Sequence, residues 1–261
     1  MNKLHVRITY FTSNTHIKIK AETCTRKNKT DDMLYKNLQD LDKYEHEFNA
    51  QGYVVIDDLL DKILIEKWNN YLQEKEDRYW TQLIKNSELE KDFNLVDEEK
   101  DILTSYNNAL RDYSEGRFCF SFKRINKPLE NSAVIDEMRS RLSSLDLINI
   151  LSRIGHRKIS TMSVFYINRF DRGDFITTHS DRGAGRNSMG IVVSLTKEWN
   201  PNYGGLTLML DRERRDINGV VMPKLGRVLI FDIIEKHNPH FVSMVTSNST
   251  IRRLALVARY Y

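Results

Sequence analysis

The stretch "KISTMSVFYINRFDRGDFITTHSD" (residues 158–181) decides the fold of this chain. Two extended runs flank the turn-forming "DRGD", and the second run ends in a histidine and an aspartate, His179 and Asp181. Side chains two residues apart on a strand point to the same face, so both can enter one cavity. Seven histidines and 36 acidic residues in 261 positions give about one such pair by chance. The interpretation of His179 and Asp181 therefore depends on the rest of the chain.

The sequence after residue 156 predicts an antiparallel β-sandwich or barrel. Its short extended runs are separated by Gly, Asn, Asp and Pro, with no helical pattern between them. The eight runs are "KISTMSVFYINRF", "DFITTHS", "SMGIVVSLT", "GLTLML", "GVVMP", "RVLIFD", "HFVSMV" and "RRLALVARYY". Strands at this spacing are typical of a sandwich or barrel and not of a parallel βαβ sheet.

The preceding part of the chain has mainly helical periodicity. "GYVVIDDLLDKILIEKW" reads as a strand that enters a helix, with Asp57 or Asp58 as the N-cap. Further helical patterns cover residues 96–113 and 132–154. Between them, "EGRFCFSFKRI" alternates as a half-buried strand, and we expect its phenylalanines to be core residues, with pocket lining as the alternative.

We expect an α+β protein with one sizeable core, which a chain of 261 residues with 40% hydrophobic content can bury. Residues 1–45 are interpreted as an extension or linker. Residues 46–261 form the single predicted domain, with a helical part at 46–156 and a β core at 157–261. The helices would pack on the outside of the sheet, leaving any chemistry in the mouth of a small barrel.

Composition narrows the functional classes. The net charge of +4 comes from 40 basic and 36 acidic residues spread along the chain, which argues against a nucleic-acid binder. No apolar segment is long enough for a membrane span, and the start lacks a secretory signal. The two cysteines, Cys24 and Cys119, form no CxxC motif, which argues against structural zinc. We therefore expect a cytoplasmic protein without membrane or nucleic-acid partners.

The strands supply a candidate metal site. "NPHFVSMV", near the seventh run, contributes His240, with His237 as the alternative in the same loop. Two imidazoles and one carboxylate form the facial triad that holds non-haem Fe(II) with open positions for other ligands. "RRLALVARYY" places Arg252 and Arg253 at the start of an apolar strand. A guanidinium there is expected to meet an anion, since burying it unpaired is costly.

From about residue 159 to 261 the chain resembles the Fe(II)- and 2-oxoglutarate-dependent oxygenases, particularly their prolyl-4-hydroxylase-like branch. The pieces that carry the resemblance occur in the family's order: "RFDRGDFITTHSD", "VVSLTKEWNPNYGGLTL", "PKLGRVLIFD", "HFVSMV" and "RRLALVARYY". The resemblance implies a double-stranded β-helix, a cupin-like jelly-roll of about eight strands. It also implies a dioxygenase that couples oxidative decarboxylation of 2-oxoglutarate to hydroxylation of an unactivated aliphatic C–H bond.

The resemblance assigns roles to residues. It implies iron on His179, Asp181 and His240, and 2-oxoglutarate on Arg253, with Arg252 as the fallback, while O2 takes the last position. Tyr166 is a further candidate contact for the co-substrate. The chain departs from the family pattern in Phe170, where a tyrosine often stands, and in Met244 and Arg259, where proline and tryptophan are common. The aspartate favours hydroxylation over halogenation, because halogenating relatives have glycine there.

Three functions remain open for the sequence. The first is a hydroxylase of a free amino acid or an amino-acid-derived small molecule, which arginines near the expected mouth, such as Arg124 and Arg182, would suit by receiving a carboxylate. The second is a hydroxylase of a protein side chain, prolyl in type, with a peptide as substrate. The third is a metal-binding jelly-roll without catalysis. The protein is expected to be a monomer or homodimer.

Overall fold

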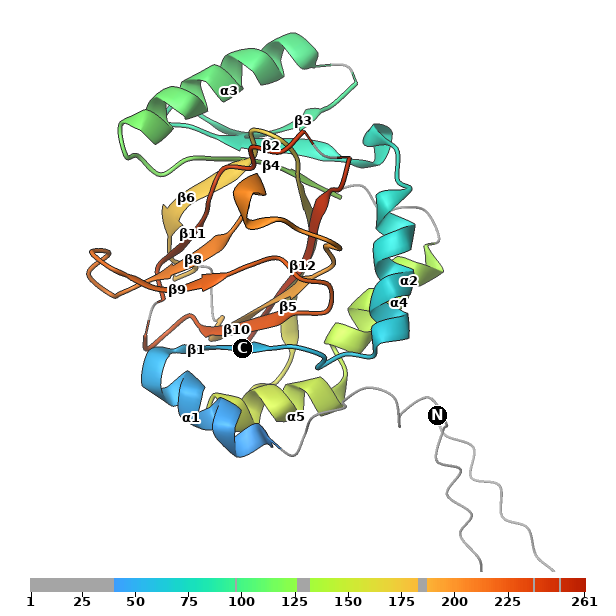
Figure 1. Cartoon of the computed structure of the whole chain (residues 1–261), viewed down its shortest axis with the longest axis vertical. Helices are drawn as coiled ribbons and strands as arrows, with labels where there is room; N and C mark the ends of the chain where they lie inside the picture. The colour runs from blue at the N-terminus through green and yellow to red at the C-terminus, as the bar shows by residue number, and fades with distance from the viewer. Residues whose placement is uncertain (1–39, 97, 126–131, 183–186, 237, 249) are drawn as a thin grey trace, which may run out of the picture. The chain divides into compact units, whose positions relative to one another are not determined.

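The computed structural model describes residues 40–96, 98–125, 132–182, 187–236, 238–248 and 250–261 (Figure 1). The expected extension at residues 1–45 lies mostly outside these ranges. Helix α1 crosses the expected boundary, since it spans Leu41–Gln51 and buries Leu41 and Phe48. The other helices are α2 (Lys62–Gln73), α3 (Glu99–Ser114), α4 (Ala133–Leu142) and α5 (Leu145–Ile154), with the short 3-10 helices η3 (Asp77–Tyr79) and η4 (Pro201–Tyr203).

The described strands form one antiparallel sheet that curls into a nearly closed barrel. They are β1 (Tyr53–Ile56), β2 (Thr81–Lys85), β3 (Glu90–Asn94), β4 (Phe120–Arg124), β5 (Met162–Phe170), β6 (Phe175–His179), β7 (Met189–Ser194), β8 (Thr207–Leu210), β9 (Ile217–Val221), β10 (Val228–Asp232), β11 (His240–Val242) and β12 (Arg253–Tyr260). Their order is β1-β10-β7-β12-β5-β4-β6-β11-β8-β9, with β2 pairing β3 and β4 beside this path.

This arrangement confirms the predicted α+β jelly-roll with helices outside the sheet, but the strand count differs. The eight runs predicted after residue 156 are β5 to β12, and each of them is a strand. The main path of the described sheet holds ten strands because β1 and β4, from the first half of the chain, pair with β10 and with β5 and β6. The helical half therefore supplies strands to the barrel as well as its covering.

The sheet nearly closes on itself. β1 and β9 are the two ends of the path, and the hydroxyl of Tyr53 on β1 donates to the carbonyl of Asn218 on β9 at 3.2 Å. A side chain at Gly219 would meet that hydroxyl, since an added Cβ would lie 2.2 Å from it. The glycine lets the two ends approach across the barrel wall.

Two helix boundaries differ from the prediction. The N-cap of α2 is Asp61, whose carboxylate accepts from the backbone N–H groups of Ile63 and Leu64. Asp57 instead binds Arg227, so the predicted cap was wrong because a distant partner took that carboxylate. The helical pattern at 132–154 is two helices, because Ser144 caps α5 and stops a continuous helix.

The helices cover the barrel in separate groups (Figure 1). α1 and α5 lie together beside β1, and α2 lies beside α4, joined where the indole N–H of Trp68 donates to Glu137 at 3.0 Å. α3 lies across β2 and β3, where Phe93, Ala109 and Cys119 share a buried apolar cluster. These contacts position the β2–β4 layer over one end of the barrel.

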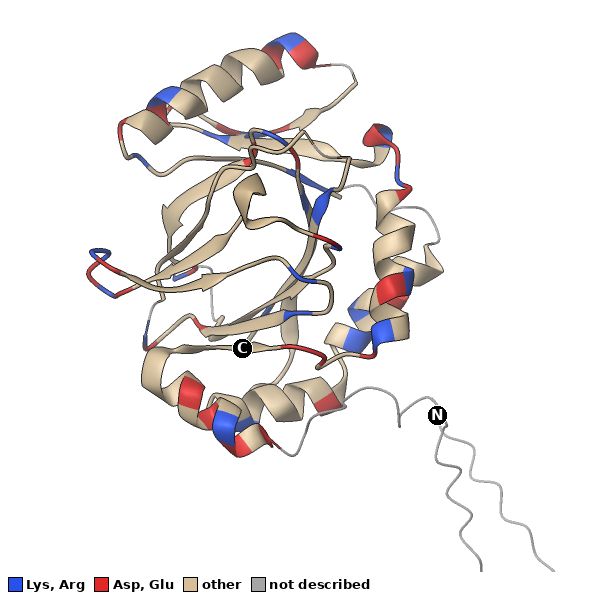
Figure 2. Cartoon of the chain, viewed as in Figure 1, with Lys and Arg blue, Asp and Glu red and all other residues tan. Residues whose placement is uncertain are grey.

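Charges of both signs are interspersed along the helices and loops (Figure 2), as expected from the nearly balanced composition. Over the residues that the structure describes, no helix has both the length and the apolar character needed to cross a membrane.

Candidate active site

The strands β6 and β11 bring two predicted ligands together. His179 at the end of β6 and His240 at the start of β11 are direct partners across the antiparallel pair. Their ring centroids lie 4.4 Å apart. They are 61 positions apart in the sequence, so their meeting is a product of the barrel topology.

The two imidazoles are fixed in the same way. Nδ1 of His179 donates to the carbonyl of Thr177 at 3.0 Å, and Nδ1 of His240 donates to that of Asn238 at 2.9 Å. A neutral ring that donates through Nδ1 keeps its lone pair on Nε2. Burial, and then the neighbouring His240, lower the pKa of His179 to about 4, so that ring is neutral at pH 7. His179 therefore presents an unprotonated Nε2 to the cavity.

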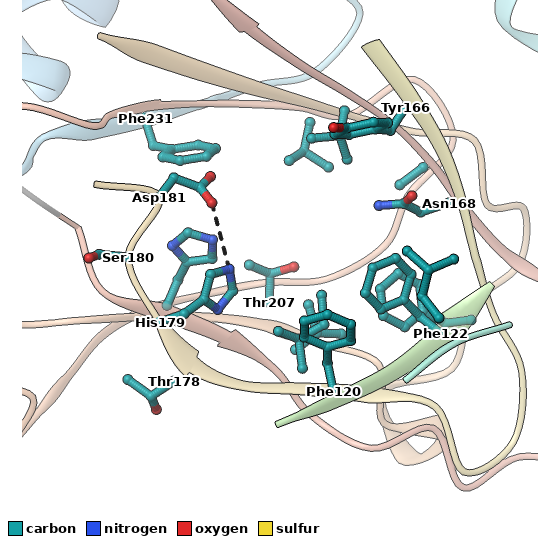
Figure 3. A pocket seen from close by; sticks show the side chains of 18 of the residues that line it. Phe120, Phe122, Tyr166, Asn168, Thr178, His179, Ser180, Asp181, Thr207 and Phe231 are labelled. Carbon is teal, nitrogen blue, oxygen red and sulfur yellow. Dashed lines mark ion pairs between the residues drawn. The ribbon is translucent and has the colours of Figure 1, made fainter. Parts of the chain in front are cut away.

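Asp181 lies beside the histidines but is held by an arginine. Its Oδ1 is 3.9 Å from Nε2 of His179, as drawn in Figure 3, and accepts from Nη2 of Arg259 at 2.5 Å. The described residues contain no three His, Cys, Asp or Glu side chains already gathered as a metal site. Oδ2 of Asp181 has no hydrogen-bond partner among the described residues. The two imidazoles and the carboxylate that would bind iron are therefore adjacent, but the carboxylate is turned toward Arg259.

Arg253 points into the same cavity from the first position of β12. Its Nε donates to the carbonyl of Gly205 at 2.6 Å, its Nη2 donates to Thr207 Oγ1 at 3.2 Å, and its guanidinium lies 4.4 Å from the centre of the Phe170 ring. Burial lowers its pKa to about 10, and no described carboxylate offsets that cost. Arg253 is therefore a buried cation that lacks an anion.

Arg252 points the other way, as period-two alternation requires. Its Nη1 donates to the backbone carbonyls of Gln73, the last residue of α2, and of Lys75, which follows that helix. The structure thus separates the two neighbouring arginines, with only Arg253 facing the cavity.

Two hydroxyl side chains near Arg253 were missed by the sequence reasoning. Thr207 on β8 lines the cavity and contacts the guanidinium. Ser194 on β7 lines a smaller space next to Arg253, and its Oγ is buried without a hydrogen-bond partner. Only the pairing of β12 with β7 reveals Ser194, because Ala255 lies opposite it. An unsatisfied buried hydroxyl is costly unless a ligand or water meets it.

The cavity has a volume of about 610 Å³, the size of a small-molecule site. Figure 3 shows His179 and Asp181 facing Tyr166 and Asn168 across it. Aromatic side chains make up much of the described wall: Phe118, Phe120, Phe122, Tyr166, Phe170 and Phe231. The phenylalanines in and just before β4 therefore have both predicted roles. Phe118, Phe120 and Phe122 line the cavity, and Phe122 is also buried in the core.

The remaining predicted residues have different outcomes. Tyr166 on β5 lines the cavity, but its ring lies under the guanidinium of Arg124, 3.7 Å from it, and its contact with 2-oxoglutarate stays a prediction. His237, the alternative to His240, lies outside the described residues. Phe118 stacks on His179 and Phe231 packs edge-on against His240, so aromatic rings flank both imidazoles.

Residues 165–259 match the protein family described as the 2OG-Fe(II) oxygenase superfamily. Three solved structures have a similar fold. A prolyl-4-hydroxylase from Pseudomonas putida has a TM-score of 0.56 at 14% identity, over 84% of this chain and 97% of that one. A 2OG-Fe(II) oxygenase family oxidoreductase from Burkholderia pseudomallei has a TM-score of 0.57 at 16% identity, over 87% and 94%.

The third is a prolyl hydroxylase from Trichoplax adhaerens in complex with a peptide fragment of the hypoxia inducible factor oxygen degradation domain. Its TM-score is 0.54 at 16% identity, over 87% of this chain and 94% of that one. Among curated proteins, no sequence matches this chain.

Residues 165–259 match the 2OG-Fe(II) oxygenase superfamily, whose members are 2-oxoglutarate-dependent dioxygenases. The chain as a whole has the jelly-roll fold of the prolyl-4-hydroxylase-like structures. The predicted family and enzyme class are confirmed, and the binding-only alternative is set aside. The superfamily uses Fe(II), 2-oxoglutarate and O2. The residues present fit these cofactors. Arg253 is buried without a carboxylate partner and the buried Ser194 hydroxyl lacks a hydrogen-bond partner, so both suit the anionic 2-oxoglutarate. The unprotonated Nε2 of His179 suits the metal.

Proposed function

We propose that the chain hydroxylates an unactivated aliphatic C–H bond of a free amino acid or an amino-acid-derived small molecule. His179, Asp181 and His240 would hold Fe(II), which with 2-oxoglutarate and O2 supplies the oxidising power for the C–H bond. The observation that carries this proposal is a buried, unpaired Arg253 in the same cavity as two imidazoles held by Nδ1.

The chain's own residues provide binding and orientation. Arg253 would pair with the distal carboxylate of 2-oxoglutarate, while Thr207 on β8 and Ser194 on β7 would donate to it. The carbonyls of Thr177 and Asn238 keep both imidazole rings in the tautomer that leaves Nε2 for the metal. Oδ2 of Asp181 is the carboxylate oxygen left for the metal while Arg259 holds Oδ1.

The size and the aromatic lining of the cavity support a small substrate. Its volume of about 610 Å³ has to hold 2-oxoglutarate as well as the substrate. Aromatic walls exclude water from the reacting C–H bond, which limits side reactions. A compact substrate with an aliphatic portion suits this space.

A second candidate is a prolyl-type hydroxylase of a protein side chain. It is favoured by the similar fold of the Trichoplax adhaerens enzyme, which holds a peptide fragment. Succinate formation measured with the twenty amino acids and with end-blocked prolyl peptides separates the two candidates. Stimulation by a free amino acid supports the first, and stimulation by the peptides alone supports the second.

A further inference from the structure

The described lining of the cavity is richer in arginine than one co-substrate requires. It contains five arginines and two carboxylates: Arg124, Arg182, Arg214, Arg253 and Arg259, with Glu90 and Asp181. Glu90 is already paired with Lys85, and Asp181 with Arg259. Bound Fe(II) adds two further positive charges, while 2-oxoglutarate carries only two negative ones. The loaded cavity therefore keeps an excess of positive charge.

Arg124 is the first of two arginines in the cavity wall that have N–H groups without a hydrogen-bond acceptor among the described residues. It ends β4, and its Nε donates to Oδ1 of Asn168 at 3.1 Å while its plane lies over the Tyr166 ring. Both of its Nη groups lack hydrogen-bond partners among the described residues. Burial lowers the pKa of Arg124. Tyr166, Asp92 and Glu90 offset part of that change, and the positive charge of Arg259 adds to it. The stacked plane presents its Nη edge as a rigid fork for a carboxylate.

Arg259 is the second. Its Nη2 is occupied by Asp181, but its Nε is buried and has no hydrogen-bond partner. It stands opposite Val164 on β5, one side-chain row beyond the pair formed by Val257 and Tyr166. Because Arg124 stacks on Tyr166, the two guanidiniums approach each other over the same part of the cavity wall.

2-Oxoglutarate does not provide a carboxylate for Arg124. It has two carboxylates: one would pair with Arg253, and the other would lie at the metal beside Asp181. Neither is left for the free Nη groups of Arg124, so the anion that meets them is a different molecule.

We infer that Arg124 and Arg259 form a subsite for the carboxylate of the substrate, an α-amino acid or its N-acyl derivative. This inference rests on the proposed function and narrows its substrate class. Since Arg259 also contacts Asp181, the bound carboxylate lies one side chain away from the metal-binding carboxylate. The C–H bond that reacts is therefore only a few bonds from the carboxylate, and the substrate is short.

The test uses the full chain reconstituted with Fe(II) and 2-oxoglutarate. Succinate formation is measured with the twenty L-amino acids and their N-acetyl derivatives, each supplied as the free acid and as the carboxamide. At least one acid should stimulate succinate formation and give a hydroxylated product by mass spectrometry. Its amide should be about tenfold less effective or worse, because it lacks the charge that both guanidiniums bind.

Arg124→Gln isolates the subsite, because this variant leaves Asp181 and Arg253 untouched. The KM for the acid should rise about tenfold or more, while the titration of the anaerobic Fe(II) complex with 2-oxoglutarate should keep its wild-type midpoint. The matched control is Arg212→Gln, an exposed arginine outside the described lining of the cavity, which should leave the KM unchanged.

Equal stimulation by acid and amide overturns the inference, as does an unchanged KM in Arg124→Gln. Turnover of end-blocked prolyl peptides without any reaction of a free acid overturns it too, and so does a panel in which no acid reacts. The proposed function is judged separately. A wild-type chain that binds neither Fe(II) nor 2-oxoglutarate in the anaerobic titration contradicts the proposed function itself.

Discussion

Single residues in this site depend on partners that lie close by in the chain. Each imidazole is held by the carbonyl two positions before it, Thr177 for His179 and Asn238 for His240. A carbonyl of β6 and one just before β11 thus set both tautomers, and neither ring needs a carboxylate partner at Nδ1. Loss of such outer contacts usually lowers metal affinity or activity 10- to 100-fold.

Asp181→Asn tests the predicted carboxylate ligand. Asparagine keeps an oxygen that can accept from Arg259 but has no negative charge to offset that of the metal, so we expect native circular dichroism and loss of most bound iron. Elemental analysis of the reconstituted protein measures this. Asp216→Asn, at an exposed position, is the control and should bind iron as the wild type does. Wild-type iron content in Asp181→Asn would exclude Asp181 from the ligand set.

Arg253→Ala and Arg252→Ala form a pair with opposite expectations. Removing Arg253 deletes a charge-assisted contact of about 1.5–3 kcal/mol, so the KM for 2-oxoglutarate should rise by about 10- to 100-fold. Removing Arg252 deletes donations to Gln73 and Lys75, which should lower the melting temperature and leave that KM nearly unchanged. Steady-state succinate assays and thermal unfolding measure the two effects. Similar KM changes in both variants would contradict the assigned register of β12.

At the scale of elements, the loop before β8 builds the floor beneath Arg253. Gly204 and Gly205 both have positive φ. A Cβ on Gly204 would lie 2.0 Å from the carbonyl oxygen of Met244, and one on Gly205 would lie 2.9 Å from Cδ of Arg253. The carbonyl of Gly205 also accepts from Arg253. The glycines therefore allow the loop to approach both the next strand and the arginine.

Gly205→Ala should impair binding of 2-oxoglutarate as well as folding. Alanine at φ +63 is strained by about 1–2 kcal/mol, and its methyl group displaces Arg253. Gly116→Ala is a matched control, since it has φ +72 but no atoms within 4 Å of an added Cβ. Both variants should unfold at lower urea concentrations, and only Gly205→Ala should also raise the KM for 2-oxoglutarate. A raised KM in Gly116→Ala would mean that general destabilisation causes the effect.

The sequence predicted the eight carboxyl-terminal strands because each is a short apolar run between turn residues, a pattern readable locally. It also predicted the meeting of His179 and Asp181, which depends only on strand alternation. It could not predict that β1 and β4 join the sheet, since pairing between distant strands leaves no local pattern. The Asp57 cap failed for the same reason, because Lys224 and Arg227 lie far along the chain.

Two side chains of the site show the same limit. Ser194 reads as an ordinary strand residue, and only the β7–β12 pairing places it near Arg253. Arg259 reads as a departure from the family pattern, and only the structure shows it bound to Asp181. Residues whose role depends on a partner in another strand are therefore the ones that a single sequence leaves undetermined.

For the molecule as a whole, closure of the barrel depends on links between its first and later strands. β1 contacts β9 through Tyr53, and the loop after β1 is tied to the segment before β10 by Asp57, which receives Nε and Nη2 of Arg227 at 2.8 and 2.9 Å and Nζ of Lys224 at 2.7 Å. Contacts at both ends of β1 therefore attach the amino-terminal half of the chain to the jelly-roll. The ion pairs of Asp57 with Lys224 and Arg227 are the contact whose contribution to stability should depend on pH.

Asp57→Asn should lower stability at neutral pH and lose its effect in acid. Hydrogen bonding from Arg227 is the largest influence that lowers the pKa of Asp57 from its ordinary value of 3.8 to about 2. A carboxyl whose pKa is lower in the folded state stabilises the fold above the unfolded pKa, and this contribution disappears as pH falls from about 4 toward 2. Because one third of the Asp57 side chain is exposed, solvent screening limits the difference in unfolding free energy to about 1 kcal/mol. Urea unfolding of wild type and Asp57→Asn at a series of pH values measures it. The two curves should converge as the pH approaches 2, and a gap that stays constant down to that pH would show that Asp57 stabilises the barrel by packing and not by its charge.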